Sequence, residues 1–393
     1  MGILIPLIFI AICCIIIWKA SDGFEVSSEY LGRNLSDGVR GATINAIASS
    51  MPELFTTIFF LIYLKDTDGF SGGIGTTAGS AIFNGMIIPA VVIFAVLFSK
   101  IATEIRVSKK VILRDGLSLI AAETVLIFLI SGNTLYWWHG FILMLTYGAY
   151  VTYMLSTMSS AEHNDSDEEE ENDDNDDQSQ NNSFFKSLIT LDLESLIIGD
   201  KKINNKSGWI LLIISMLVIG SACLILVAAC EMIGAETYSL PLIGELNGLN
   251  IPIMFVAVIL ASAATSVPDT IISIKDAKNG NYNDAISNAL GSNIFDVCFA
   301  LGFPLFLYCI FYGPISMSPE IVQFSSELRI LLLILTIAAF FVYFIGPKMT
   351  KLKGFILLSI YLLFTIYIVG RSMEAEWSNA ISNFLSSLYN LIT

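Results

Sequence analysis

Two short stretches of this chain decide how it folds: Ser49-Ser50-Met51-Pro52-Glu53 and Thr265-Ser266-Val267-Pro268-Asp269. Each stretch lies in a long apolar segment and places hydroxyl residues before a proline and a carboxylate. A second matched pair follows, GSAIFN at residues 79–84 and GSNIFD at residues 291–296. The two pairs occur in the same order, so the chain contains an internal repeat.

The composition places this repeat in a membrane protein. Of the 393 residues, 55% are hydrophobic and only 14% are charged, which is too little charge to cover a soluble globule. A soluble enzyme, a collagen-like chain and a disulfide scaffold do not fit this composition. A nucleic-acid-binding protein is also excluded, because there is no basic patch. The six cysteines lie in apolar stretches without Cys-x-x-Cys spacing, so we expect buried free thiols.

Ten apolar segments are long enough to cross a bilayer core of about 30 Å as helices. We expect these spans at residues 3–18, 38–64, 73–99, 111–131, 135–157, 207–233, 249–274, 285–311, 328–345 and 352–370. The first is predicted to be a retained helix rather than a cleaved signal, because no basic residue precedes its apolar run. The predicted fold is an all-α polytopic membrane protein with ten transmembrane helices.

The two repeat copies lie five predicted spans apart. Because five is an odd number, the copies must cross the membrane in opposite directions, as two inverted-topology repeats of five helices. A single Pro-Glu or Gly-Ser motif is often only a kink or a close helix contact. The same pair of motifs twice, in mirrored topology, instead favours a ligand site near the bilayer midplane between the repeats.

The segment between the two halves has a different composition, with a dense run of Asp, Glu and Asn from Glu162 to Asp177. Such a tract buries too little apolar surface to fold. It is either a solvated linker or a loose calcium-sensing tract, since it lacks EF-hand spacing. We expect four parts: residues 1–157 as the first five-helix half, 158–206 as an acidic disordered linker, 207–373 as the second half and 374–393 as an amphipathic helix on the outer surface.

Lys and Arg are unevenly divided between the two predicted sides of the membrane. With the N-terminus outside and alternating helices, seventeen of them lie in inner loops and three in outer loops. This bias follows the positive-inside rule. We therefore expect both termini outside and the acidic linker in the cytoplasm. Without an organelle-targeting signal, the plasma membrane is the default location.

Both repeat signatures supply oxygen atoms near mid-membrane. Pro52 and Pro268 each remove a backbone donor, which should free the carbonyl groups of Ala48 and Ala264. Hydroxyl, amide and carboxylate side chains lie in the same turns and in the adjoining helices. The candidate ligands are Ser49, Ser50, Glu53, Ser80, Asn84, Thr265, Ser266, Asp269, Ser292 and Asp296.

This donor set predicts a hard cation. An ionised carboxylate near mid-bilayer costs roughly 3 kcal/mol or more when nothing neutralises it. Zinc and copper are disfavoured because neither signature contains His or Cys. Calcium, which accepts about six to eight oxygens, fits better than magnesium, and sodium could share the site. Two cations competing for one site exposed alternately to each side are the minimum for an antiporter.

Three further polar residues have less certain roles. Glu123 lies inside the fourth predicted span and faces a cavity or lies near the outer interface. Asp284 and Asn288 precede the second Gly-Ser motif and could be gate or capping residues. None of the three has a counterpart in the other repeat.

The motifs resemble those of the cation/calcium exchanger superfamily, whose two repeats carry Gly-Thr-Ser-x-Pro-Glu/Asp followed by Gly-Ser-Asn-x-Phe-Asn/Asp. The similarity covers residues 41–89 and 256–304, and the span pattern extends it over the whole chain. The resemblance implies that Glu53 and Asp269 are the central calcium ligands. The other eight candidates would contribute to calcium or sodium subsites, with backbone carbonyls near Ala46 and Ser262.

Some positions depart from the general pattern and look like the potassium-dependent sodium/calcium exchanger branch. They are the Ser49-Ser50 pair, the run from Ser266 to Asp269, Ala81 in place of Asn, and Asp296. The three carboxylates of the two signatures would be neutralised by one calcium and one potassium ion, or by three sodium ions. A proton on one of the carboxylates would do the same. Potassium co-transport is therefore a hypothesis.

The expected function is an antiporter that uses a sodium gradient to move calcium across a lipid bilayer, with no prosthetic group, no enzymatic activity and no nucleic-acid partner. A proton/calcium exchanger is the main alternative, although neither repeat has the Gly-Asn-x-x-Glu pattern of that branch. A cation channel is a further alternative and would need a continuous pore. A nontransporting calcium sensor built on the acidic tract is the last.

Overall fold

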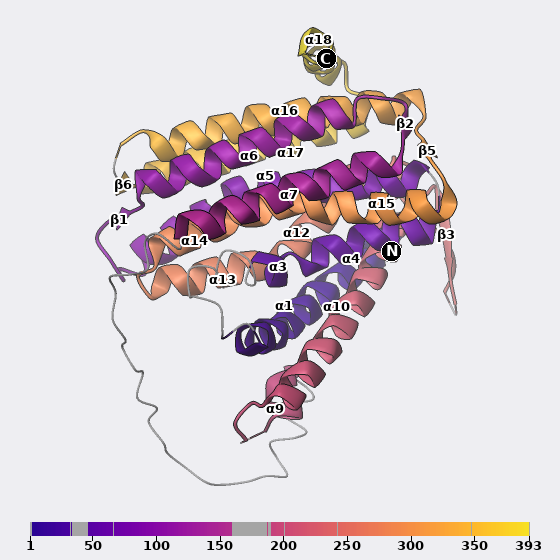
Figure 1. The fold of residues 1–393 in the computed structure, drawn as a ribbon. Coiled ribbons are helices and arrows are strands. Elements are labelled where there is room, and N and C mark those ends of the chain that lie inside the picture. Colours follow the sequence, from indigo (N-terminus) through magenta and orange to yellow (C-terminus); the bar gives the residue numbers. More distant parts are fainter. Residues whose placement is uncertain are drawn as a thin grey trace.

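The structure, a computed structural model, describes residues 2–31, 33, 46–65, 67–158, 187, 190–199, 201–241, 243–346 and 348–392. Long helices make up most of it and run roughly side by side, and their ends gather at two opposite faces (Figure 1). The acidic run from Glu162 to Asp177, predicted to be disordered, lies outside the described residues.

Helical segments follow one another in the predicted order. In the first half they are α1 (Leu4–Leu31), α3 (Ala46–Ser49), α4 (Met51–Phe59), the π-helix η2 (Phe60–Leu64), α5 (Thr67–Phe98), α6 (Lys109–Leu129) and α7 (Trp137–Met158). After the short α9 (Leu193–Ile197), the second half contains α10 (Asn205–Gly234), α11 (Ile253–Val256), η4 (Ala257–Ala261), α12 (Ser262–Thr265), α13 (Val267–Lys278), α14 (Tyr282–Phe295), η5 (Asp296–Ala300), α15 (Leu301–Tyr312), α16 (Pro319–Phe344), α17 (Lys351–Ser372) and α18 (Glu376–Ile392).

Among the described residues, six helices have both the length and the composition of a membrane span. The number is seven when the bent pair of residues 253–265 and 267–278 counts as one span, which is still fewer than the ten predicted. Helices α6 and α7 are not among them. Helix α6 carries Arg114, Asp115 and Glu123, and α7 contains several Trp and Tyr residues and a histidine, which lower its hydropathy. A membrane protein is supported, and ten spans remain a prediction.

Two very short strand pairs join the halves at opposite faces of the bundle. The pairs are β1 (Ile105–Arg106) with β6 (Lys348–Met349), and β2 (Thr134–Leu135) with β5 (Ile315–Ser316). Strands β1 and β5 directly precede α6 and α16, whereas β2 and β6 precede α7 and α17. The first pair joins the segment before α6, in the first half, to the segment before α17, in the second. The second pair joins their repeat counterparts, the segments before α16 and α7, as an inverted repeat requires. A third pair, β3 (Thr237–Leu240) with β4 (Gly244–Asn247), is a hairpin.

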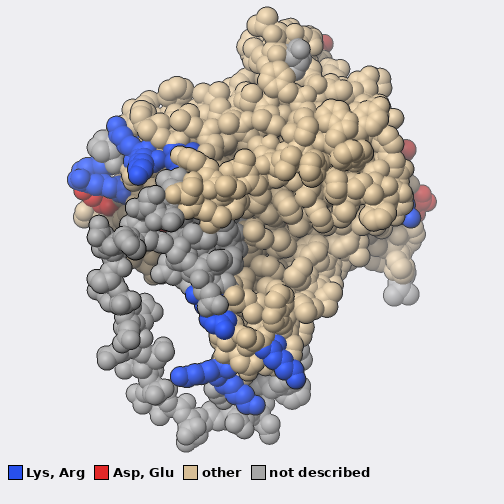
Figure 2. Space-filling view, viewed as in Figure 1, with Lys and Arg blue, Asp and Glu red and all other residues tan. Residues whose placement is uncertain are grey.

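An exposed carboxylate accompanies the β1–β6 pair. Glu104 forms ion pairs with Lys348 and, at 2.7 Å, with Arg106. Hydrogen bonds from Lys348 and Arg106 lower the pKa of Glu104. In the space-filling view, basic residues gather at the end where β1 and β6 lie and at the end where α9 lies, with a largely uncharged surface beyond them (Figure 2). This layering agrees with the predicted membrane band.

Helix α5 is the centre of the packing and contacts α4, α14, α16 and α17. Glycine is required at Gly79, because a Cβ atom there would lie 2.8 Å from the Ser262 Oγ on α12. Its repeat counterpart Gly291 is less constrained, since the nearest atom to such a Cβ would be the Tyr150 hydroxyl at 3.7 Å. The close approach therefore brings α5 of the first half against α12 of the second.

Helix α1 is longer than predicted and runs to Leu31 instead of ending near Trp18. Its extension continues along α10, where a Cβ on Gly23 would lie 2.9 Å from the Ser215 Oγ (Figure 1). Helix α9 packs on both helices and buries Leu193. The predicted linker is therefore ordered in its last part, next to the start of α10.

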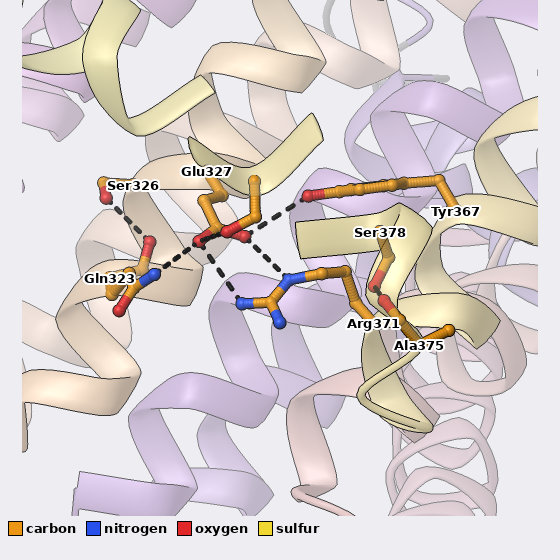
Figure 3. A network of polar contacts seen from close by, with 8 residues as sticks. Gln323, Ser326, Glu327, Tyr367, Arg371, Ala375 and Ser378 are labelled. Atoms are coloured by element: carbon orange, nitrogen blue, oxygen red, sulfur yellow. Dashed lines mark hydrogen bonds and ion pairs between the residues drawn. The ribbon is translucent and has the colours of Figure 1, made fainter. Parts of the chain in front are cut away.

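A buried polar network joins α16, α17 and α18 (Figure 3). The Glu327 carboxylate, fully buried, accepts hydrogen bonds from Arg371 Nε at 3.1 Å and Ser382 Oγ at 2.5 Å. Gln323 and Tyr367 donate to it at 3.0 and 3.3 Å. Every donor but Gln323 comes from another helix, so this one carboxylate fastens α17 and α18 to α16.

Helix α16 begins at Pro319, nine residues before the predicted span, and this changes the place of Arg329. Arg329, near the start of the predicted span, was one of the three basic residues counted in outer loops, with Lys65 and Arg371, but it is only 1% exposed. Its guanidinium donates to the backbone carbonyls of Ile127, Ile130 and Ser325. Carbonyls at the C-terminal end of α6 thus replace a carboxylate as its partner.

The C-terminal segment forms the predicted amphipathic helix as α18. Its contact face includes Ser378, Ser382 and Leu385, all buried, whereas Phe384 and Leu391 are 62% and 82% exposed. The side toward the protein is therefore partly polar. The exposed side carries large apolar residues interspersed with exposed Asn379, Asn383, Ser387 and Asn390. Exposed apolar side chains of this size suit a helix that lies at a lipid surface.

The cysteines are free thiols, and all are buried except the half-buried Cys14. This confirms the expectation of packed, unpaired cysteines.

Candidate functional site

The two signature stretches form two matching helix breaks. Helix α3 ends at Ser49 and α4 begins at Met51, while α12 ends at Thr265 and α13 begins at Val267. At both breaks one serine leaves the helical conformation in the same way. Ser50 has φ −94° and ψ 9°, and its repeat counterpart Ser266 has φ −78° and ψ 4°. The repeat is therefore present in the backbone.

The prolines start new helices instead of kinking continuous ones. Pro52 and Pro268 each lie in the first turn, where the missing N–H has no helical partner to lose. The acids Glu53 and Asp269 follow in the same first turns, at the helix end that favours negative charge. That the breaks free the carbonyls of residues 48 and 264 stays a prediction.

Each acid accepts a hydrogen bond from the serine of the following Gly-Ser motif. Ser80 Oγ lies 3.1 Å from Glu53 Oε1, and Ser292 Oγ lies 2.8 Å from Asp269 Oδ1. These serines come from α5 and α14, which are repeat counterparts. The same acid–serine contact is therefore built twice.

Side chains of the two repeats also contact one another directly. Ser80 Oγ lies 2.8 Å from Ser266 Oγ and 3.0 Å from Asp296 Oδ2, and both partners belong to the second half. Asn84 Nδ2 donates to Asp269 Oδ2 at 3.3 Å. Ser49 Oγ lies 3.4 Å from the Ser292 hydroxyl. Neither half alone contains the whole cluster.

All ten residues predicted from the sequence are buried, with exposed fractions of 0%. Eight are linked by the contacts above. Thr265 donates to the Ser262 carbonyl at 3.1 Å and also interacts with Glu53. Ser50 interacts with Asp296, although its Oγ makes no hydrogen bond of good geometry with the described residues. The Ser262 carbonyl also accepts from the Ser266 N–H at 3.0 Å. That carbonyls near Ala46 and Ser262 are ligands stays a prediction.

The cluster contains oxygen atoms that nothing in the described protein satisfies. Glu53 Oε2, Asp296 Oδ1 and Asn84 Oδ1 are buried without a hydrogen-bond partner, like Ser50 Oγ. Folded proteins rarely leave such buried atoms unpaired, because each atom loses its hydrogen bonds to water on burial and gains none in return. Among the described residues, no Lys or Arg forms an ion pair with Glu53, Asp269 or Asp296. A bound cation would contact the unpaired oxygens and would supply the missing positive charge.

The ligands would have to be mixed in kind. Within the described ranges, no three acidic, His or Cys side chains lie close enough to hold a metal ion by themselves. Serine hydroxyls and the Asn84 amide lie between the carboxylates and would complete the shell. An all-oxygen shell of this kind suits calcium or sodium and disfavours zinc and copper.

Asn293 is a polar residue of this region that the sequence analysis did not single out. Its Nδ2 donates to the carbonyl of Ala81, its own repeat counterpart, at 2.9 Å. Its Oδ1 is buried and has no partner in the described structure. The alignment of the two Gly-Ser motifs, which pairs Asn293 with Ala81, could have shown this asymmetry.

The two residues before the second Gly-Ser motif lie apart from the cluster. Asn288 Nδ2 donates to Ser273 Oγ on α13 at 3.2 Å. Asp284 lies in the first turn of α14, as a capping role would place it. The gating role considered for them is not tested by these contacts.

Comparison with known proteins identifies the family. A family model described as sodium/calcium exchanger protein matches residues 5–156 and 207–370. The chain belongs to the sodium/calcium exchanger family. As an exchanger, it carries its two signature stretches within the two matched regions, on either side of the unmatched acidic tract.

Individual exchangers are similar to this chain at modest identity. Sodium/potassium/calcium exchanger 5 of Homo sapiens is 26% identical over 396 aligned residues, which cover 86% of this chain and 76% of that protein. Sodium/potassium/calcium exchanger 1 of Gallus gallus is 33% identical over 126 residues, which cover 32% of this chain. The matched part is only 18% of the length of the chicken protein.

Solved exchangers share the fold. The H+/Ca2+ exchanger CAX has a TM-score of 0.56 at 12% identity, covering 97% of this chain and 92% of that one. The sodium-calcium exchanger NCX_Mj, soaked with Na+ and Sr2+, has a TM-score of 0.52 at 21% identity, covering 92% and 97%. At these identities the likeness is one of fold, and the fold is common to exchangers with different driving ions.

Proposed function

We propose that this exchanger is a secondary active antiporter that moves calcium against sodium by alternating access at the buried carboxylate cluster. The observation that carries the proposal is the set of unpaired oxygens on Glu53, Asn84 and Asp296, buried with no basic partner in the described structure. A transported cation supplies the missing positive charge. Moving the empty, charged cluster across lipid would be costly, so the site changes sides only when occupied.

The proposed topology supports this cycle. Ten spans in two inverted repeats, 1–157 and 207–373, would place the cluster at the pseudo-twofold axis near the midplane. The exchanged strand pairs β1–β6 and β2–β5 support that symmetry. We further propose both termini outside, a cytoplasmic acidic linker at 158–206, a lipid-facing helix at 374–393 and residence in the plasma membrane, following the basic inner loops.

Flux in reconstituted vesicles tests the driving ion. Vesicles loaded with sodium should take up calcium when diluted into sodium-free medium, because outward sodium flow supplies the free energy. Vesicles loaded with potassium or choline at the same pH are the control. Uptake driven by an imposed proton gradient and indifferent to sodium would instead establish the proton/calcium alternative. Uptake that runs passively down the calcium gradient would indicate a channel.

Potassium co-transport is proposed from Asp296, which adds a third carboxylate to the cluster and contacts Ser80. Three negative charges match one calcium plus one potassium ion, whereas two would match calcium alone. The relatives named sodium/potassium/calcium exchangers are consistent with this count.

Replacing Asp296 by asparagine should therefore make sodium-driven calcium uptake independent of potassium. The amide keeps the size and one oxygen ligand but removes the third charge. The measurement is the initial rate of uptake with and without potassium on the calcium side, compared with the wild type. A variant that retains the wild-type potassium response would refute the role of Asp296.

A further inference from the structure

Another buried carboxyl, that of Glu123, lies outside the buried cluster formed by the ten candidate residues. Glu123 projects from α6 and is 0% exposed. Thr336 Oγ1 on α16 donates to its Oε1 at 2.7 Å, but its Oε2 has no hydrogen-bond partner among the described residues. No Lys or Arg of the described chain forms an ion pair with it. The carboxyl therefore has one donor and no counter-charge.

The surroundings hold too few oxygens for a metal ion. The only described hydrogen-bond partner of the carboxyl is the Thr336 hydroxyl, which with the two carboxyl oxygens gives three oxygens, against about six to eight ligands for calcium. Residues one turn away on α6, Leu119 and Ile127, are buried and apolar. Helix α6 also packs on η5, where the buried thiol of Cys298 lies close enough to interact with Glu123. No described hydrogen bond joins Glu123 to the ten residues of the cluster. A calcium or sodium ion would stay largely unligated at this place.

The cavity beside Thr336 is too small for a hydrated cation. It has a volume of about 10 Å3 between α5, α6, α14 and α16, room for one water molecule at most, and Glu123 is not among its lining residues. Most of its lining is apolar, as at Leu119 and Phe340. Its other hydroxyl, that of Tyr343, already donates to the Gly85 carbonyl. This cavity therefore offers an ionised Glu123 little hydration.

An unpaired charge in the membrane interior is costly, and a proton removes that cost without needing further ligands. We propose that Glu123 is a proton-binding site, whose carboxyl stays protonated while ions pass through the separate cluster. The consequence for transport rests on the proposed function. With Glu123 neutral, the buried carboxylates that lack a basic partner in the described structure are Glu53, Asp269 and Asp296, the three charges that the transported cations would balance.

Infrared spectroscopy of the full-length protein in vesicles tests this charge state. A protonated carboxyl has a C=O stretching band that a carboxylate lacks. The wild-type spectrum minus that of Glu123→Gln should contain this band at neutral pH, with the same intensity in sodium and in calcium. A difference spectrum without the band would show that Glu123 is ionised. A band lost on adding calcium would show that the proton competes with the ion, which also overturns the proposal.

Two further variants assign the band. Thr336→Val removes the only described donor to the carboxyl and should shift the band to higher frequency without abolishing it. The exposed Glu245, changed to Gln, should leave the band intact. If Glu123→Gln does not fold, the frequency of the band in Thr336→Val decides whether the band belongs to Glu123. A band at the wild-type frequency would belong to another group and would refute the assignment to Glu123.

The reversal potential of exchange is an independent readout. A neutral Glu123 contributes no charge, so Glu123→Gln should exchange calcium with the wild-type reversal potential and at a rate within about twofold of it. The reversal potential is set by the number of ions exchanged per cycle, so a shifted value would show that Glu123 is ionised and counts in the charge balance of transport, which overturns the proposal. The infrared band does not require transport, so absence of any flux would refute the proposed function and leave the charge state to be decided by spectroscopy.

Discussion

Calcium uptake by Glu53→Gln vesicles is expected to fall by about 100-fold or more. Glutamine keeps the size of the side chain and one oxygen, but it removes a buried negative charge that a divalent ion would neutralise. Removing one partner of a buried charge interaction costs about 3–5 kcal/mol, and each 1.4 kcal/mol is about tenfold in affinity. The measurement is the initial rate of sodium-driven uptake over a range of calcium concentrations.

The matched control is Glu245→Gln, the same chemical change on an exposed residue of the β3–β4 hairpin. It should transport like the wild type. The melting temperature of Glu53→Gln should be unchanged or higher, because an unpaired buried charge has been removed. Normal uptake by Glu53→Gln would refute the assignment of the cluster as the transport site.

Loss of Glu327 is expected to cause the largest change in stability. Glu327→Leu leaves Arg371 without its carboxylate and removes the acceptor of Ser382 on α18. Breaking one partner of a buried pair destabilises a protein by about 3–5 kcal/mol. The free energy of unfolding, measured by denaturant titration in detergent, should fall by that amount. Glu320→Leu, on the exposed start of the same helix, should change it by about 0.5 kcal/mol at most.

The double variant Glu327→Leu, Arg371→Leu separates the pair from its surroundings. If the cost arises from leaving one charge uncompensated, the double variant should be more stable than Glu327→Leu alone. Additive losses in the two single variants would show that the two residues act independently. Calcium exchange should persist in every variant that folds, because this network lies outside the ion cluster.

The sequence predicted the members of the buried cluster better than the ends of the helices. Repetition of the two motifs was enough to select ten residues that the structure buries. The contact of each acid with the serine of the following motif comes from the structure. Which partners cross between repeats could not be predicted. The contact of Ser80 with Asp296 depends on the three-dimensional approach of α5 to the second half.

Errors arose where a charge has a partner distant in the chain. The predicted ninth span began at residue 328, directly after the charged Glu327, and Arg329 was counted with the outer loop, whereas α16 buries both residues. A hydropathy pattern registers the charge of Glu327 but cannot register Arg371, which neutralises it from the next helix. The two-residue strands were missed because they are too short to show any alternation.

The strand pairs have a consequence for the assembly of the chain. The pairs β1–β6 and β2–β5 each take one strand from each half, and the buried cluster likewise draws its oxygens from both. A polypeptide cut anywhere in the acidic tract would keep all of these contacts available, but only if its two fragments meet. Neither fragment could bind the transported ions by itself, so the two would behave as obligate complementary subunits of one carrier.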